Sequence, residues 1–113
     1  MTDINTVVVV GRLTKNAEFR QLANTYQCKF SIANNRARKV DGEWKEEVSY
    51  IDILAWGRLA ENMQGKLPKG TKVTVNGYLR QERWEMDNEK KSKLVVLADQ
   101  IDIHTPREAV NGF

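Results

Sequence analysis

Residues 48–57 read Val-Ser-Tyr-Ile-Asp-Ile-Leu-Ala-Trp-Gly, and their strict alternation constrains the fold more than any other feature of the chain. In an extended strand, successive side chains point to opposite faces. One face would be small and aliphatic, as a hydrophobic core requires, and consists of Ile51, Ile53 and Ala55. The other face has a ring near each end and consists of Tyr50, Asp52, Leu54 and Trp56. Such rings either pack into a second buried layer or lie flat on the sheet, where a nucleobase can stack on them.

Further strands and one helix are indicated along the rest of the chain. We expect strands at residues 7–13, 26–34, 72–84 and 93–103, with residues 18–21 as a short continuation of the first. The first and the last carry apolar residues on both faces, which predicts strands buried on both sides. Gly11 and Gly77 lie within strands and indicate sharp bends. Apolar residues between Gly57 and Gly65 recur at helical spacing and predict a helix of about two turns.

The order of these elements predicts the fold class. Because no long helix separates the strands, a parallel α/β sheet is excluded. Five strands with glycine bends, and one short helix between the third and the fourth, are typical of an OB-fold, a small all-β barrel. The chain has 113 residues, which is enough for one such domain. We expect this domain at residues 1–104 and a short disordered tail at residues 105–113.

Composition narrows the classes of function. A net charge of +3 and a pI of about 9.1 are compatible with a polyanionic partner. The sequence has no membrane-spanning run and no signal peptide, so we expect a cytoplasmic protein without a membrane partner. Cys28 and His104 are the single cysteine and the single histidine, which argues against a disulfide, a metal cluster and a catalytic triad. Cys28 fits best as a small core residue.

The sequence also lacks the usual marks of catalysis. It contains no nucleophile–base pair and no glycine loop that could cradle a phosphate. Carboxylates such as Asp52, Asp87 and Asp99 are interpreted as solvated or locally hydrogen-bonded. We therefore expect a protein that is not an enzyme and needs no cofactor or metal.

Residues 35–45 form a charged segment without an apolar period, which predicts a protruding hairpin or loop. Asp41-Gly42 marks its turn. Arg36 and Arg38 belong to a basic cluster on one arm, which is either a solvated face or a contact for an anionic partner. Trp44 on the other arm is unusual, since an exposed tryptophan normally packs against something or binds something. A second polar loop is expected at residues 86–92.

Several short motifs, taken together, resemble the bacterial single-stranded DNA-binding protein family (SSB). They include Val-Gly-Arg-Leu-Thr-Lys at the end of the first strand, the run from Tyr50 to Asn62, and Val-Asn-Gly-Tyr-Leu in the fourth strand. They occur in family order at residues 10–15, 18–20, 30–33, 41–43, 50–62, 69–70, 75–79 and 96–99. Each motif is weak alone, but their order and spacing are specific and extend to about residue 103.

The resemblance implies an OB-fold that wraps single-stranded DNA around a multi-subunit core, typically a homotetramer, with a dimer as the alternative. Base-stacking positions of the family fall on Tyr50, Trp56 and Trp84. Basic positions along the DNA path fall on Arg20, Arg58, Lys69 and Arg80. We add Arg12, Arg36 and Arg83 as basic candidates. One departure is Arg38, which stands where the family often has an aromatic; its guanidinium plane can stack, or Trp44 can substitute.

A second departure concerns the end of the sequence. Family members that recruit replication and repair proteins usually end in an acidic tip, whereas this sequence ends Asn111-Gly-Phe113 without an acidic run. Recruitment of such partners through a tip is therefore not supported.

The expected function is binding of single-stranded DNA with little sequence preference, which protects it during replication, recombination and repair near the nucleoid. The alternatives are a dimeric primosome-type adaptor of replication restart, a nuclease on an OB scaffold, and a protein whose main ligand is RNA.

Overall fold

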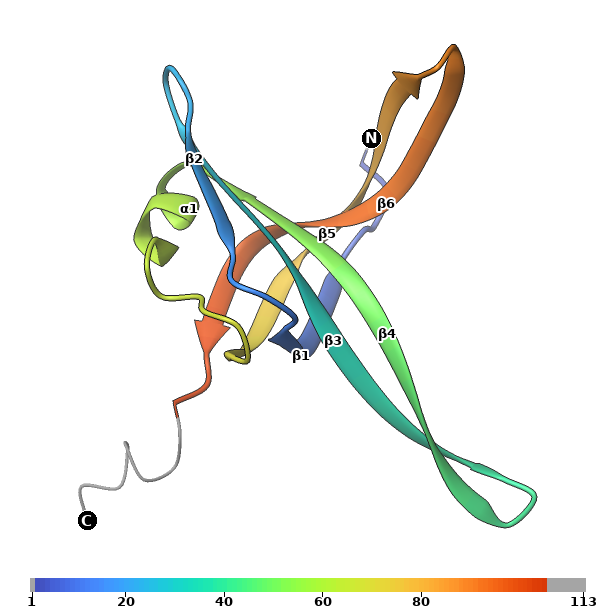
Figure 1. Ribbon diagram of the computed structural model, residues 1–113. Helices are drawn as coiled ribbons and strands as arrows, with labels where there is room; N and C mark the ends of the chain where they lie inside the picture. The colour runs from blue at the N-terminus through green and yellow to red at the C-terminus, as the bar shows by residue number, and fades with distance from the viewer. Residues whose placement is uncertain (1, 106–113) are drawn as a thin grey trace, which may run out of the picture.

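The computed structural model describes residues 2–105, and these form an all-β structure with one short helix (Figure 1). The elements are β1 (Val7–Leu13), β2 (Glu18–Gln21), β3 (Tyr26–Val40), β4 (Glu43–Trp56), α1 (Gly57–Met63), β5 (Lys72–Met86) and β6 (Glu89–Ile103). In the described part of the chain, no helix is long and apolar enough to cross a bilayer. The tail expected at residues 105–113 lies, apart from Thr105, outside the described residues.

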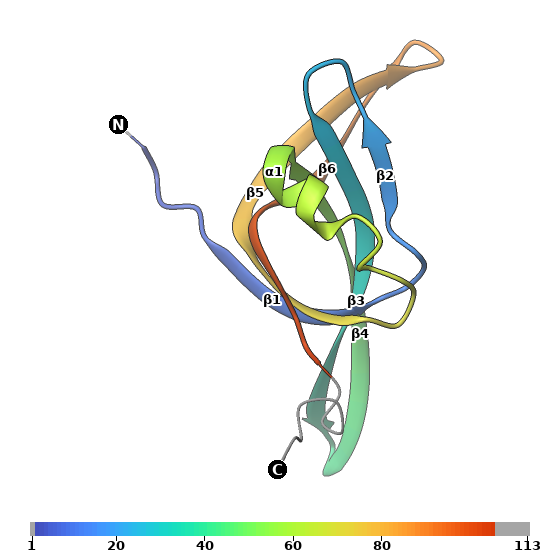
Figure 2. The same cartoon turned by 90° about the vertical axis from the view of Figure 1, so that its left-hand side faces the viewer.

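The strands close into a five-stranded barrel, as the element order predicts. The sheet order is β1-β5-β6-β4-β3-β2, and β1 also pairs with β3, which closes the ring. β1 pairs with β5 over most of its length and meets β3 at Arg12 and Leu13. β2 then continues along the same edge of β3, so the interpretation of residues 18–21 as a continuation of the first strand is confirmed. Figure 2 shows β1 and β5 curving round to β3, against which α1 packs.

Two glycines allow the bends that closure requires. A Cβ atom on Gly11 would stand 2.7 Å from the carbonyl oxygen of Ala33, where β1 crosses from β5 to β3. A Cβ atom on Gly77 would overlap the carbonyl oxygen of Leu97 on the neighbouring strand. The register between β5 and β6 shifts by a bulge between Asn76 and Gly77. Both predicted bends are therefore sites where two backbones approach too closely for a side chain.

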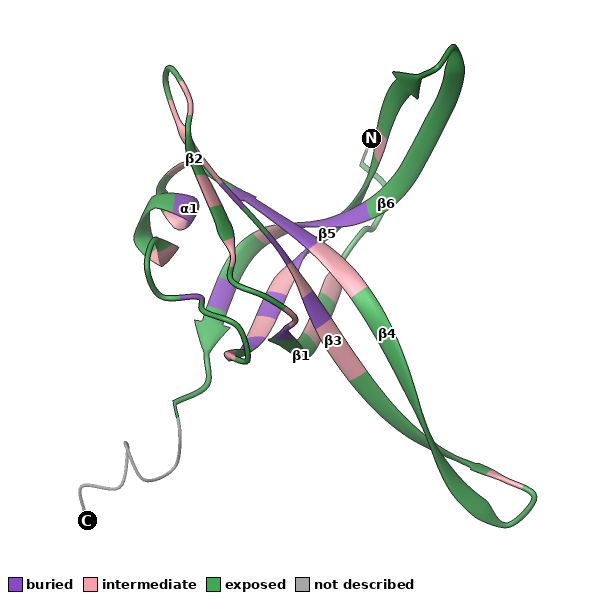
Figure 3. Cartoon of the chain, in the orientation of Figure 1, coloured by how far each residue is buried: buried purple, intermediate pink, exposed green. Residues whose placement is uncertain are grey.

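Apolar side chains from β1, β3, β4, β5, β6 and α1 fill the barrel interior. Figure 3 shows the buried stretches of the chain in purple. The buried members of this core are Leu13, Cys28, Phe30, Ile32, Ile53, Ala55, Ala60, Leu67, Val73, Val75, Val96 and Ile101. The expectation that Cys28 is a core residue is confirmed, and burial raises the pKa of its thiol to about 11. A second, small buried cluster of Leu54, Val95 and Leu97 lies on the other side of β4 and β6. The centre of the last strand is thus buried on both faces, as predicted.

The expectation that the first strand is buried on both faces was wrong for β1. Val7 and Val9 pack against the core, but Val8 and Val10 are 61% and 36% exposed in the single chain. The reason is that β-branched residues favour strands whether or not their face is covered. An apolar run therefore predicts the strand but not the burial of both its faces.

Two hairpins extend well beyond the barrel and are exposed at their tips (Figures 1 and 3). β3 and β4 stay paired up to Val40 and Glu43, which confirms a protruding hairpin. β5 and β6 stay paired up to Met86 and Glu89, so the loop predicted at residues 86–92 is wrong. Each hairpin closes through two residues with positive φ, Asp41-Gly42 in one and Asp87-Asn88 in the other. The polar composition of residues 86–92 predicted a loop, because a strand that is solvated on both faces lacks the alternation of apolar residues by which strands are recognised.

We expect Gly77→Ala to lower the free energy of unfolding by about 1–3 kcal/mol or more, because a methyl group cannot fit against the Leu97 carbonyl without a backbone shift. Urea unfolding at equilibrium measures this. Glu85→Ala, at an exposed position of the same strand, serves as the control and is expected to stay within about 0.5 kcal/mol of wild type. A Gly77→Ala variant as stable as wild type would show that the bulge does not need glycine.

Candidate nucleic-acid interface

The strand register defines one solvent-facing surface that combines rings with basic side chains. Directly paired residues share a face of a sheet. Gln27 pairs with Arg20 on one side and with Trp56 on the other, so these three form a row across β2, β3 and β4. The neighbouring row of the same face consists of Glu18, Lys29, Leu54, Leu97 and Tyr78. We call the surface that contains these two rows the outer face.

Three rings predicted to bind bases lie on the outer face. Tyr50 and Trp56 follow the alternation of β4, and Trp84 follows Tyr78 at an even spacing on β5. Tyr50 is 71% exposed, Trp56 36% and Trp84 40%. The alternative in which Tyr50 and Trp56 fill a second buried layer is therefore excluded for the single chain. The buried second layer is formed instead by the aliphatic cluster around Leu54.

Three adjoining hollows run along the outer face and share Lys29. The first is lined by Glu18, Phe19, Arg20, Gln27 and Lys29. The second is lined by Lys15, Asn16, Glu18, Lys29, Phe30, Ser31, Asp52 and Lys93. The third is lined by Lys29, Arg80, Gln81, Glu82, Arg83, Trp84 and Lys93. We call these three hollows together the lysine groove, because Lys29 lines all three, Lys93 lines two and Lys15 lines one. It leads from Arg20 to Trp84.

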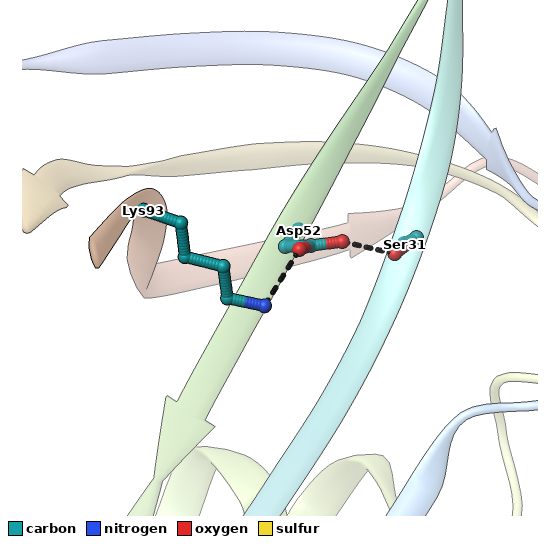
Figure 4. Close-up of polar contacts among 3 residues, drawn as sticks. All are labelled: Ser31, Asp52 and Lys93. Carbon is teal, nitrogen blue, oxygen red and sulfur yellow. Dashed lines mark hydrogen bonds and ion pairs between the residues drawn. The ribbon is translucent and has the colours of Figure 1, made fainter. Parts of the chain in front are cut away.

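Three carboxylates line the lysine groove, those of Glu18, Asp52 and Glu82. Figure 4 shows Asp52 of β4 between Ser31 and Lys93. The Ser31 hydroxyl donates a hydrogen bond to its Oδ1, and Lys93 Nζ lies 3.0 Å from its Oδ2. The hydrogen bonds from Ser31 and Lys93 hold the pKa of Asp52 below its ordinary value of 3.8. The interpretation of Asp52 as locally bonded is confirmed, and the group is anionic near neutral pH.

Arg80 and Arg83 border the groove beside Trp84, and each has a polar neighbour on its own strand. Arg80 lies 3.8 Å from a carboxylate oxygen of Glu82. Arg83 donates a hydrogen bond of 2.7 Å to the side-chain oxygen of Gln81. Both guanidinium groups are exposed, so these contacts can be exchanged for a phosphate without a large free-energy cost.

Arg12 and Lys69 gather at the turn that precedes β5. Arg12 donates a hydrogen bond of 3.1 Å to the Gly70 carbonyl. The backbone N–H of Lys69 donates one of 2.8 Å to the side chain of Asn16, which lines the lysine groove. Lys69 therefore lies beside Asn16 of the lysine groove, and Arg12 lies at the same turn. Arg58, in the first turn of α1, borders a different hollow beside the β2–β3 turn.

The structure does not bring Arg36 and Arg38 to the outer face. They pair with Glu47 and Lys45, which alternate with the outer-face residues of β4. Arg38 is also held by an ion pair of 2.8 Å between its Nε and Glu47 Oε1. Trp44 is 71% exposed, but Lys39 Nζ lies over its ring at 5.9 Å from the centroid. Arg38 is thus engaged by Glu47, whereas the Trp44 ring stays largely exposed and alternates in phase with Tyr50 on β4.

Three lysines of the groove, Lys15, Lys29 and Lys93, are absent from the set of binding residues that the sequence predicts. The alternation of Cys28 and Phe30 into the core did place Lys29 on the opposite face, so its orientation could be predicted. Its meeting with Lys93, from a strand more than sixty residues further along the chain, needs the three-dimensional register. Within residues 2–105, no three His, Cys, Asp or Glu side chains are placed to hold a metal ion.

Comparison with known proteins decides the family. A family model described as "Single-strand binding protein family" matches residues 4–104. The chain belongs to the single-strand binding protein family. It is 44% identical over 104 residues to the single-stranded DNA-binding protein of Treponema pallidum (strain Nichols), covering 91% of this chain and 59% of that relative. It is 36% identical over 106 residues to the protein of the same name from Borreliella burgdorferi, covering 91% and 71%. The chain thus spans about three fifths of the Treponema pallidum relative's length.

Solved structures of the family have the same fold. The single-stranded DNA-binding protein of Thermus aquaticus superposes with a TM-score of 0.81 at 31% identity, covering 93% of this chain and 52% of that one. A Plasmodium falciparum SSB in complex with single-stranded DNA superposes with a TM-score of 0.84 at 18% identity, covering 93% and 98%, and supports the fold alone. The predicted OB-fold and family are therefore confirmed.

The Asp52 ion pair predicts a pH effect on stability. Because the pKa of Asp52 is lowered by folding, its ionised form stabilises the folded state above pH 3.8, and this contribution disappears as the pH falls through the lowered pKa. We expect wild type to melt at a higher temperature than Asp52→Asn near neutral pH, and the difference to shrink below pH 3.8. Calorimetry of the two proteins across this range measures it. A difference that stays constant into strong acid would contradict the assignment.

Proposed function

We propose that the chain binds single-stranded DNA through its outer face, with little sequence preference. Bases stack on Tyr50, Trp56 and Trp84, and phosphates contact the basic side chains of the lysine groove. The observation that carries this proposal is that three exposed rings share one face with a groove lined by Lys15, Lys29 and Lys93. Arg20, Arg80 and Arg83 extend the basic lining to both ends of the groove.

The two kinds of contact together explain a preference for unpaired strands. Cationic side chains neutralise phosphates and release counterions, so the affinity should fall steeply as salt is added. A ring offers its flat side to any base, and each stacked base contributes about 1–3 kcal/mol. A duplex hides the faces of its bases inside the stack. A ligand that exposes both phosphates and base faces is therefore favoured over a duplex.

The names of the relatives support the same ligand, since those from Treponema pallidum and Borreliella burgdorferi are called single-stranded DNA-binding proteins. We propose that this chain likewise covers single strands during replication, recombination and repair, in the cytoplasm near the nucleoid, without catalysing a reaction. We further propose that it acts as a homotetramer, with a dimer as the alternative, and sedimentation equilibrium separates the two.

We expect Trp56→Ala and Trp84→Ala each to weaken binding of an oligothymidylate about 5- to 150-fold, which corresponds to the loss of one stacked base worth about 1–3 kcal/mol. Both rings are exposed, so neither substitution should unfold the barrel. Titration followed by quenching of tryptophan fluorescence measures the affinity.

Leu94→Ala is the matched control for these variants. Leu94 is 64% exposed and belongs to β6, but it alternates with Val95 of the second cluster and so faces away from the outer face. Its truncation should leave the affinity unchanged. Equal affinities for wild type and for both tryptophan variants, with all three folded, would refute the stacking surface.

A further inference from the structure

The carboxylate of Asp52 lies in the lysine groove and would repel the phosphates of the ligand proposed for it. Asp52 lies on β4 between Tyr50 and Trp56, which are two of the rings proposed to hold bases. It lines the same hollow as Lys15, Lys29 and Lys93. A phosphate drawn into this hollow by the lysines would therefore meet a fixed negative charge.

The surroundings of Asp52 keep it charged and correctly placed. Ser31 on β3 donates to one carboxylate oxygen, and Lys93 on β6 donates to the other at 3.0 Å (Figure 4). Lys29 on β3 adds a further favourable charge and also contributes to the low pKa of Asp52. Glu18 on β2 and Lys15 before it line the same hollow, and Arg80 and Glu82 on β5 line the adjoining one. Both carboxylate oxygens thus receive donors, in the way that two oxygens of a phosphate would.

The ion pair between Asp52 and Lys93 is open to solvent. The Lys93 and Asp52 side chains are 40% and 41% exposed. Pairs this accessible to water contribute little to folding, and they exchange partners readily. A strand that reaches the groove can therefore compete with Asp52 for Lys93.

We propose that Asp52 is a built-in competitor for the phosphates of the bound strand: in the free protein its carboxylate occupies Lys93, and a phosphate must displace it to use that lysine. This inference rests on the proposed function and describes how the same site is regulated. Its consequence is that the chain binds less tightly, and with a weaker salt dependence, than its lysines alone would allow. A moderate affinity lets a protein that covers single strands leave them when they are copied or repaired.

The test compares binding of an oligothymidylate to wild type and to Asp52→Asn over a series of salt concentrations. Asparagine keeps the size of the side chain and can still accept from Ser31, but it releases Lys93. We expect the affinity at low salt to rise about three- to tenfold, since one repulsive charge near a phosphate is removed. The slope of log K against log salt should steepen by about 0.7, which is one additional phosphate contact on a single strand.

Three further variants distinguish the release of Lys93 from a general effect of net charge and from an effect of changing the Asp52 side chain. Asp41→Asn makes the same change of net charge at the exposed tip of the β3–β4 hairpin, at a positive φ that asparagine also tolerates, and should leave affinity and slope unchanged. Asp52→Glu keeps the charge and should keep the wild-type slope. In the double variant Asp52→Asn with Lys93→Gln, the slope should return to the wild-type value, because the released cation is gone. Asp52→Ser replaces Asp52→Asn if thermal melting shows that the asparagine variant does not fold.

The proposal is overturned if folded Asp52→Asn binds no more tightly than wild type with the same slope, or if Asp41→Asn reproduces its gain. A failure of the proposed function looks different, since wild type itself would then not bind the oligonucleotide.

Discussion

The register of β4 between β3 and β6 is the constraint on which both the fold and the site depend. Pairing of Ile53 with Phe30 and Val96 directs one set of β4 side chains into the barrel. The same pairing directs Tyr50 and Trp56 to the solvent. A slip of one residue would exchange the two sets, burying rings and a carboxylate while exposing the core. Core packing therefore enforces the orientation of the proposed binding surface.

The charges on the outer face are balanced rather than uniformly basic. Lys93 is paired with Asp52, and Arg80 has Glu82 nearby, whereas Lys29 lies at the meeting point of all three hollows. A groove in which some cations already have acidic partners attracts a polyanion from solution but does not hold every phosphate at full strength. Stacking on rings is insensitive to this balance. Salt therefore weakens the electrostatic attraction between the strand and this face, whereas it affects the stacking of bases on the rings less.

Much of the fold follows from the sequence, because strands with one face in a core alternate visibly and glycines mark close backbone approaches. The closed barrel, the single helix and the bends at Gly11 and Gly77 were predicted on these grounds. The extension of β5 and β6 beyond the barrel was not, since polar strands resemble loops. For the site, exposure of the rings on β4 and β5 could only be offered as one of two alternatives. The meeting of Lys29, Lys93 and Asp52 depends on pairing between distant strands, which no local pattern encodes.

The most direct test of this account is a crystal structure of the chain with a bound oligothymidylate. The account predicts bases stacked on Trp56 and Trp84 and phosphates beside Lys29, with the strand following the outer face from Arg20 to the β5–β6 hairpin. A strand bound instead across Val8 and Val10 of β1, or along the Arg36 and Arg38 side of the β3–β4 hairpin, would contradict it.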